Sequence, residues 1–195
     1  MPGTGVCNDL RGGSMPGESE TTGTRQKQTS DIAERLWLAA ELKVLAPRRT
    51  FSMNDAVDVA LFLTDRLFKD AGVEIYRELN PEIPEVDAQM GQIEQALVNI
   101  LLNACEATER GGVVTVTTDH TEDKGVEVRI ADTGCGMPPD ELDKVFEVFY
   151  STRGRLGVGL SSARELVSGF GGDIRIESSV GKGTNVSVDL PSVAH

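Results

Sequence analysis

The clearest hydrophobic pattern along the chain lies at residues 92–107. Its apolar positions recur at spacings of three and four residues: Ile93, Leu97, Ile100, Leu101 and Ala104. This period predicts one long amphipathic helix. Similar periods predict helices at 30–47, at 52–71 and at 158–168, and a short one at 140–147.

Alternation of apolar and polar residues predicts five strands. They lie at 73–79, 113–118, 126–130, 173–177 and 185–190. The second and third strands are joined by a short polar loop, so we expect an antiparallel hairpin. Strands and helices grouped in this order favour an α+β sandwich, in which three or four helices cover one face of a mixed sheet.

The 92–107 helix also carries a polar stripe. At about 100° per residue, Asn99, Asn103 and Glu106 fall on the same side of successive turns. Asparagine costs roughly 0.7 kcal/mol against alanine within a helix, so two of them four residues apart need a reason. The stripe is either a solvent-exposed face or a site for a hard cation, because amide oxygens suit Mg²⁺ without adding charge.

Composition and charge limit the functional classes. A net charge of −12 argues against binding to nucleic acid or to an anionic membrane. No run approaches the roughly eighteen apolar residues that a membrane-spanning helix needs. Three widely spaced cysteines suit a reducing cytoplasm better than a disulfide framework or a zinc site. Residues 1–29, rich in Gly, Ser, Thr and Pro and without a secretory pattern, are expected to be a disordered or tag-like tail.

A candidate site for a flat polar ring follows the third predicted strand. Asp132 comes at the strand end and opens the loop Asp-Thr-Gly-Cys-Gly-Met. A carboxylate there can accept a hydrogen bond from an exocyclic amine, and the two glycines let a ring approach the backbone. The alternative is an ordinary Asx turn with two turn glycines.

A candidate anion site lies at the start of the 158–168 helix, where residues 157–162 read Gly-Val-Gly-Leu-Ser-Ser. Free N–H groups at a helix start attract phosphate. A dinucleotide-binding turn would need a third glycine and a preceding strand, and a Walker loop would need Gly-Lys-Ser/Thr. A plain helix start remains open, and so does the reading of Arg153 and Arg155 as exposed loop charges rather than phosphate ligands.

Taken in order, the motifs are N-x-x-x-N-A, D-T-G-C-G-M, F-x-x-F, G-x-G-L and G-K-G-T. Their combination resembles the ATP-binding catalytic domain of bacterial sensor histidine kinases, within the gyrase, chaperone, histidine kinase and mismatch-repair ATPase superfamily. The resemblance covers residues 52–191. It implies a Bergerat-type two-layer sandwich, a mixed five-stranded sheet with about three helices on one face. It also implies ATP and Mg²⁺ as cofactors and transfer of the γ-phosphoryl group to a histidine.

The resemblance assigns roles to particular residues. Asn99 and Asn103 would be the catalytic residues and magnesium ligands. Asp132 would bind the adenine amine, and Thr184 would support it through water. The other cofactor-binding matches lie in the glycine loops and the phenylalanine box: Gly134, Gly136, Phe146, Phe149, Arg153, Gly157, Gly159 and Leu160.

Two departures from the family pattern bear on mechanism. Arg155 and Leu156 replace the first Gly-Thr of the usual glycine box, and no histidine precedes position 120. The 30–47 helix would be at most the end of a dimerisation hairpin. We therefore expect the phosphoacceptor histidine to lie on a dimerisation domain outside this chain, with a response regulator as a further partner.

Position 99 separates the family's reactions. Relatives that phosphorylate serine or hydrolyse ATP resemble one another in placing a glutamate there as general base. Asn99 cannot take a proton, which disfavours hydrolysis and an anti-sigma-type serine kinase. A degenerate nucleotide-binding scaffold, used for docking or phosphotransfer without kinase activity, is the other alternative.

Overall fold

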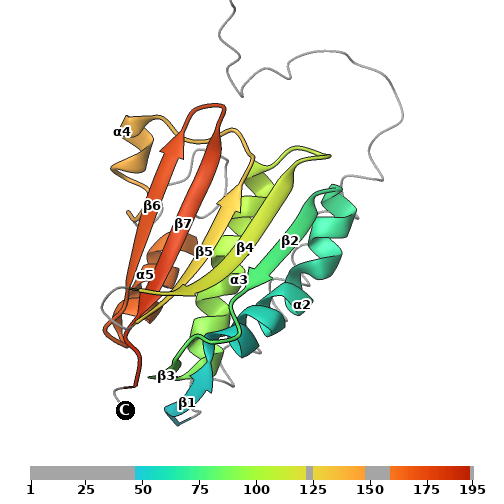
Figure 1. Ribbon diagram of the computed structural model, residues 1–195. Coiled ribbons are helices and arrows are strands. Elements are labelled where there is room, and N and C mark those ends of the chain that lie inside the picture. The colour runs from blue at the N-terminus through green and yellow to red at the C-terminus, as the bar shows by residue number, and fades with distance from the viewer. Residues whose placement is uncertain (1–46, 122–124, 148–158, 194–195) are drawn as a thin grey trace, which may run out of the picture. The chain divides into compact units, whose positions relative to one another are not determined.

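In the computed structural model, which describes residues 47–121, 125–147 and 159–193, a five-stranded sheet carries helices on one face (Figure 1). The strand order is β2-β4-β5-β7-β6. These strands are β2 (Glu74–Leu79), β4 (Val113–His120), β5 (Val126–Asp132), β6 (Asp173–Ser179) and β7 (Gly183–Leu190). The helices on that face are α2 (Met53–Ala71), α3 (Met90–Ala107) and α5 (Gly159–Ser168). The predicted α+β two-layer sandwich is confirmed.

The sheet is mixed, because β2 runs parallel to β4 and the other neighbours are antiparallel. The predicted hairpin is β4–β5, with Val116 opposite Ile130. Alternation along each strand sends one set of side chains towards the helices. These inward residues are almost fully buried: Val114, Val116, Val126, Val128, Ile130, Ile174, Val186, Val188 and Leu190.

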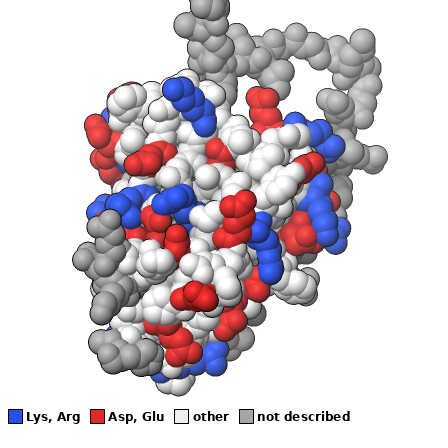
Figure 2. All heavy atoms as spheres, in the orientation of Figure 1, with Lys and Arg blue, Asp and Glu red and all other residues white. Residues whose placement is uncertain are grey.

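The opposite face of the sheet is polar, and Figure 2 shows basic and acidic side chains interspersed on it. Arg175 on β6 bridges to Asp189 on β7 at 2.8 Å and to Glu127 on β5 at 3.2 Å. Arg129 adds a 2.6 Å ion pair to Glu127. The outward charges of neighbouring strands therefore compensate one another, and helices are needed on one face only.

Local signals place the helix ends. Ser52 caps α2 by accepting a hydrogen bond from the Asn54 N–H at 3.3 Å. Gly72 ends α2 with φ +70, and its N–H reaches the carbonyls of Phe68 and Lys69. The predicted bounds of α2 are confirmed, and α3 begins at Met90, two residues before the start of the periodic pattern.

Two parts of the sequence-based layout were wrong. Residues 85–88 and 49–52, for which the sequence pattern predicts no strand, form β3 (Glu85–Ala88) and β1 (Arg49–Ser52), which pair antiparallel in a separate two-stranded sheet. The helix expected at 140–147 is only α4 (Pro139–Leu142), followed by turns. The predicted helix at 30–47 lies almost wholly outside the described residues. No helix in the described part of the chain is long and apolar enough to cross a membrane.

Candidate functional site

Asp132 is the last residue of β5 and is only 8% exposed. It pairs in register with Thr184 on β7. Its Oδ1 accepts hydrogen bonds from the N–H of Gly134 at 2.8 Å and from the N–H of Thr184 at 3.2 Å. The first of these bonds forms an Asx turn. Such a turn is the alternative interpretation of Asp132 in the sequence analysis, and the structure contains it. The second ties the same carboxylate to the next strand, which fixes its orientation at the sheet end.

The loop after Asp132 passes close to two other backbones. The Cys135 N–H donates to the carbonyl of Ala107 at the end of α3, at 3.1 Å. A Cβ at Gly134 would collide with that same carbonyl, and a Cβ at Gly136 would collide with the carbonyl of Ser179. The glycines are therefore needed for close approach. They hold the loop between α3 and β6.

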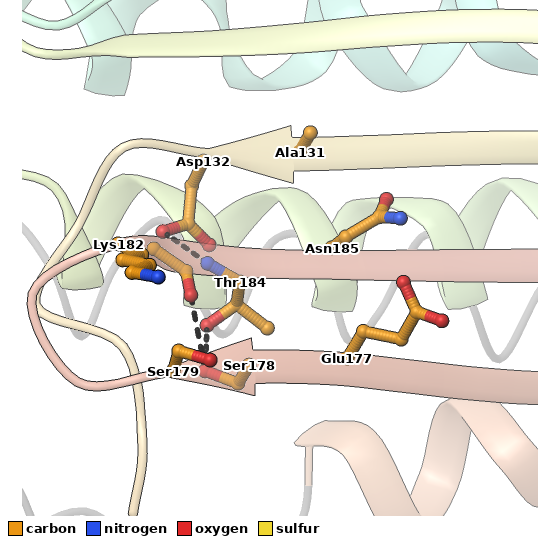
Figure 3. A pocket seen from close by; sticks show the side chains of 9 residues that line it. Ala131, Asp132, Glu177, Ser178, Ser179, Lys182, Thr184 and Asn185 are labelled. Atoms are coloured by element: carbon orange, nitrogen blue, oxygen red, sulfur yellow. Dashed lines mark hydrogen bonds between the residues drawn. The ribbon is translucent and has the colours of Figure 1, made fainter.

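Ser178 on β6 is a site residue that the sequence did not reveal. Its Oγ accepts from the N–H of Met137 at 2.8 Å, lies 3.1 Å from the carbonyl of Gly183 and lies 3.0 Å from the Thr184 Oγ1. Figure 3 shows the contacts of Ser178 with Gly183 and Thr184 beside Asp132. One hydroxyl thus connects the ends of β6 and β7 with the loop that carries Gly134 and Gly136. The sequence feature that could have identified Ser178 is a polar residue at an inward position of β6, three residues before Gly181 in the following turn.

The two asparagines lie on α3, and both are half-buried. Asn103 faces the first residue of α5, because a Cβ at Gly159 would lie 3.3 Å from the Asn103 Nδ2 and 3.6 Å from its Oδ1. Asn99 is one turn earlier on the same helix. The structure thus brings together two motifs that the sequence predicts separately, the asparagine helix and the glycine-led helix.

These residues fit a magnesium ion that is carried by phosphates. Within the described ranges, no three His, Cys, Asp or Glu side chains are placed to hold a metal ion. Mg²⁺ keeps several waters and takes few protein ligands when a polyphosphate supplies the rest. The neutral amide of Asn103 faces the start of α5 and matches that requirement, because the N-terminus of that helix also favours the phosphate.

The phenylalanine box is only partly within the described residues. The guanidinium of Arg164 on α5 lies over the Phe146 ring, with its Cζ atom 4.5 Å from the ring centroid. Arg164 also approaches Asp173 at 3.8 Å. Leu160 is half-buried in the first turn of α5. Phe149, Arg153 and Gly157 lie outside the described residues.

A cavity of about 240 Å³ opens at the same end of the sheet. Its lining combines inward and outward positions: Ala131, Asp132, Glu177, Ser178, Ser179, Lys182, Gly183, Thr184 and Asn185 (Figure 3). Neither Asn103 nor Gly159 lines it. The cavity therefore adjoins the hydrogen bonds around Asp132 and not the asparagine helix.

Comparison with known proteins places these features in a family. A family model described as histidine kinase-, DNA gyrase B-, and HSP90-like ATPase matches residues 89–194. The histidine protein kinase DivJ of Caulobacter vibrioides is 37% identical over 150 residues, which cover 74% of this chain and 25% of that protein. The chain therefore spans about a quarter of the length of this relative.

Two solved structures share the fold. The mycobacterial sensor histidine kinase MprB matches with a TM-score of 0.67 at 25% identity, covering 76% of this chain and 99% of that chain. The catalytic domain of the histidine kinase ThkA matches with a TM-score of 0.67 at 25% identity, covering 75% of this chain and 97% of that chain. The matched family region includes α3, the Asp132 loop, α5 and β7. The chain belongs to the family of histidine kinase-, DNA gyrase B- and HSP90-like ATPases, and within that family it is an ATP-binding catalytic domain of the sensor histidine kinase kind.

Proposed function

We propose that this domain binds Mg-ATP and transfers the γ-phosphoryl group to a histidine on a two-component dimerisation domain. The observation that carries the proposal is the approach of Asn103 to Gly159. The same helix ends beneath the glycine loop, where Ala107 accepts from the Cys135 N–H. A single rigid element, α3, thus connects an amide at the start of α5 with the loop that follows Asp132.

At the base end, the chain supplies hydrogen-bond acceptors and bare backbone. An ionised carboxylate only accepts hydrogen bonds, so Asp132 suits the exocyclic amine of adenine. Gly134 and Gly136 have no side chain to separate a flat ring from the main chain. Burial of Asp132 strengthens its hydrogen bonds, because water competes less well there.

At the phosphate end, the N–H groups and the positive end of α5 would receive phosphate oxygens. Asn103 and Asn99 would hold the magnesium ion. When bound, that ion neutralises charge on the β- and γ-phosphates. The two asparagines contribute position and no proton transfer, since an amide is not a base.

The absence of a base at position 99 suits a nucleophile that needs none. A neutral imidazole has a free ring nitrogen lone pair, whereas serine or water must lose a proton to attack. The chain would then accelerate transfer by positioning and by charge stabilisation. Histidine is therefore the acceptor that these residues favour over serine.

The proposal extends to the organisation of the chain. Residues 52–191 would be the catalytic unit, 30–47 the end of a dimerisation hairpin and 1–29 a tail. A histidine-bearing dimerisation domain and a response regulator would be the partners, in the cytoplasm. The 37% identical relative is itself named a histidine protein kinase, which supports this assignment.

A transfer assay tests the function. The full chain is incubated with Mg²⁺, γ-labelled ATP and a separately produced helix pair that bears a histidine. We expect acid-labile label on the helix pair, and loss of label with Asn103→Ala. Gln92→Ala removes an amide three turns earlier on α3 and is the matched control that should retain transfer. Bound ATP without transfer would favour the scaffold alternative, and acid-stable phosphoserine would favour the serine kinase.

A further inference from the structure

The hydroxyl of Ser178 has a complete set of hydrogen-bond partners within the protein. Three polar atoms lie within hydrogen-bond distance of its Oγ: the Met137 nitrogen at 2.8 Å, the Thr184 Oγ1 at 3.0 Å and the Gly183 carbonyl oxygen at 3.1 Å. A hydroxyl carries one proton and two acceptor lone pairs. Three partners therefore fill it, and each must take one specific role.

Two of these roles are fixed by chemistry. A main-chain N–H can only donate, so Met137 occupies one lone pair of Ser178. A carbonyl can only accept, so Gly183 takes the single proton of Ser178. The remaining lone pair faces Thr184, and Thr184 must donate into it. The Thr184 proton is thus directed at Ser178 and away from any ligand.

The consequence falls on the polar edge of the base pocket. With its proton committed, the Thr184 Oγ1 can only accept further hydrogen bonds. Its main-chain N–H already donates to Asp132 Oδ1 at 3.2 Å. Asp132 and Thr184 together then offer acceptors to a ligand. At position 6, an amino purine presents N–H donors to these acceptors, whereas a 6-carbonyl purine presents an acceptor there and leaves them unpaired.

We propose that Ser178 is a specificity-determining positioning residue, which orients the Thr184 hydroxyl so that the pocket selects a 6-amino purine over a 6-oxo purine. This inference rests on the proposed binding of a nucleotide at Asp132. Ser178 acts through Thr184 and is not assigned contact with the base. This effect on base selectivity is separate from that of the negative charge of Asp132, because it depends on which atom the Thr184 hydroxyl proton points to.

The test compares ATP with ITP, which differ at position 6 and in protonation of the adjacent ring nitrogen. Isothermal titration gives the ratio of the ITP and ATP dissociation constants for each protein. We expect a ratio well above one for the wild type and a fall of about tenfold or more for Ser178→Ala, because Thr184 regains a proton to donate. Ser178→Thr keeps a hydroxyl and should keep the ratio. Ser168→Ala, at an exposed serine that ends α5 and does not line the cavity, is the matched control and should also keep it.

A purely structural role predicts a different result, since it would weaken both nucleotides equally. An unchanged ratio in Ser178→Ala therefore overturns the proposal. In a Thr184→Val background, Ser178→Ala should change the ratio no further, and an additional fall would contradict the route through Thr184. If the Ser178→Ala protein shows no cooperative thermal unfolding, the test rests on Thr184→Val alone. The ratio of the ITP and ATP dissociation constants must then fall in Thr184→Val, and an unchanged ratio overturns the proposal. Wild-type protein that binds neither nucleotide refutes the proposed function itself, whereas wild-type ATP binding with an unaltered variant ratio refutes only the role of Ser178.

Discussion

The turn between β6 and β7 contains two glycines that separate two physical effects. Gly181 and Gly183 both have left-handed backbones, with φ +74 and +87. A Cβ at Gly181 would meet nothing within 4 Å. A Cβ at Gly183 would collide with the carbonyl oxygen of Asp132. The same Cβ would lie 2.8 Å from the Asp132 carbonyl carbon and 3.1 Å from the Thr133 Cα. Alanine at either position strains the backbone, but only Gly183→Ala also crowds the site.

The magnitudes follow from this difference. A left-handed conformation costs a residue with a Cβ about 1–2 kcal/mol, which both variants should lose from the free energy of unfolding. Forcing a Cβ against a main chain that cannot rotate away adds about 1–3 kcal/mol, and only Gly183→Ala incurs it. Because the displaced atoms belong to Asp132, we also expect its affinity for ATP to fall by about tenfold or more, the equivalent of roughly 1.4 kcal/mol.

Urea unfolding followed by circular dichroism measures the first effect, and calorimetric titration with Mg-ATP measures the second. Gly181→Ala is expected to bind ATP like the wild type. Equal destabilisation of the two variants would show that the crowding at Asp132 is relieved at no cost. Wild-type affinity in a folded Gly183→Ala protein would refute the link between this turn and the base pocket.

Three further predictions concern other parts of the site and sheet. Arg164→Met should lower the free energy of unfolding by about 0.5–1 kcal/mol through loss of the cation–π contact, and in a double-mutant cycle this loss should vanish when Phe146 is leucine. Burial raises the pKa of the Cys105 thiol, so iodoacetamide should label Cys135 before Cys105, as peptide mass spectrometry would show, and saturating ATP should slow that labelling; equal labelling rates would contradict it. Burial also raises the pKa of Asp189, so the folded protein binds that proton more tightly than the unfolded chain does. Relative to Asp189→Asn, wild-type stability in urea should therefore rise as the pH falls through the raised folded pKa towards 3.8, and a fall would refute the sign.

Long periodic segments predicted most of the fold. The α3 pattern and the β4–β5 alternation each span several turns or residue pairs, so local preference and final structure agree. β1 and β3 are only four residues each. Their pairing joins Thr50 with Asp87, and it depends on the packing of distant segments rather than on a local pattern. The α4 helix ended early because its residues bury no apolar face.

The candidate site shows a similar division. Asn103, Asp132 and Gly159 were predicted as separate chemical signals, and the resemblance to a family supplied their grouping. In the structure Asn103 lies next to Gly159, whereas the roles of these residues stay predictions. Ser178 was missed because a single serine in an alternating strand carries no periodic signal. Its importance comes from three partners that only the fold brings to one oxygen.

In the proposed function, Asn103 binds the magnesium ion at the phosphate end of the nucleotide, while the Asp132 loop binds the base. Calorimetric titration of ATP, with and without Mg²⁺, into wild-type and Asn103→Ala proteins tests it most directly, with adenosine as a ligand that lacks phosphates. We expect Mg²⁺ to tighten ATP binding in the wild type and to have little effect in Asn103→Ala, while both proteins bind adenosine equally. Equal tightening by Mg²⁺ in the two proteins would contradict the account.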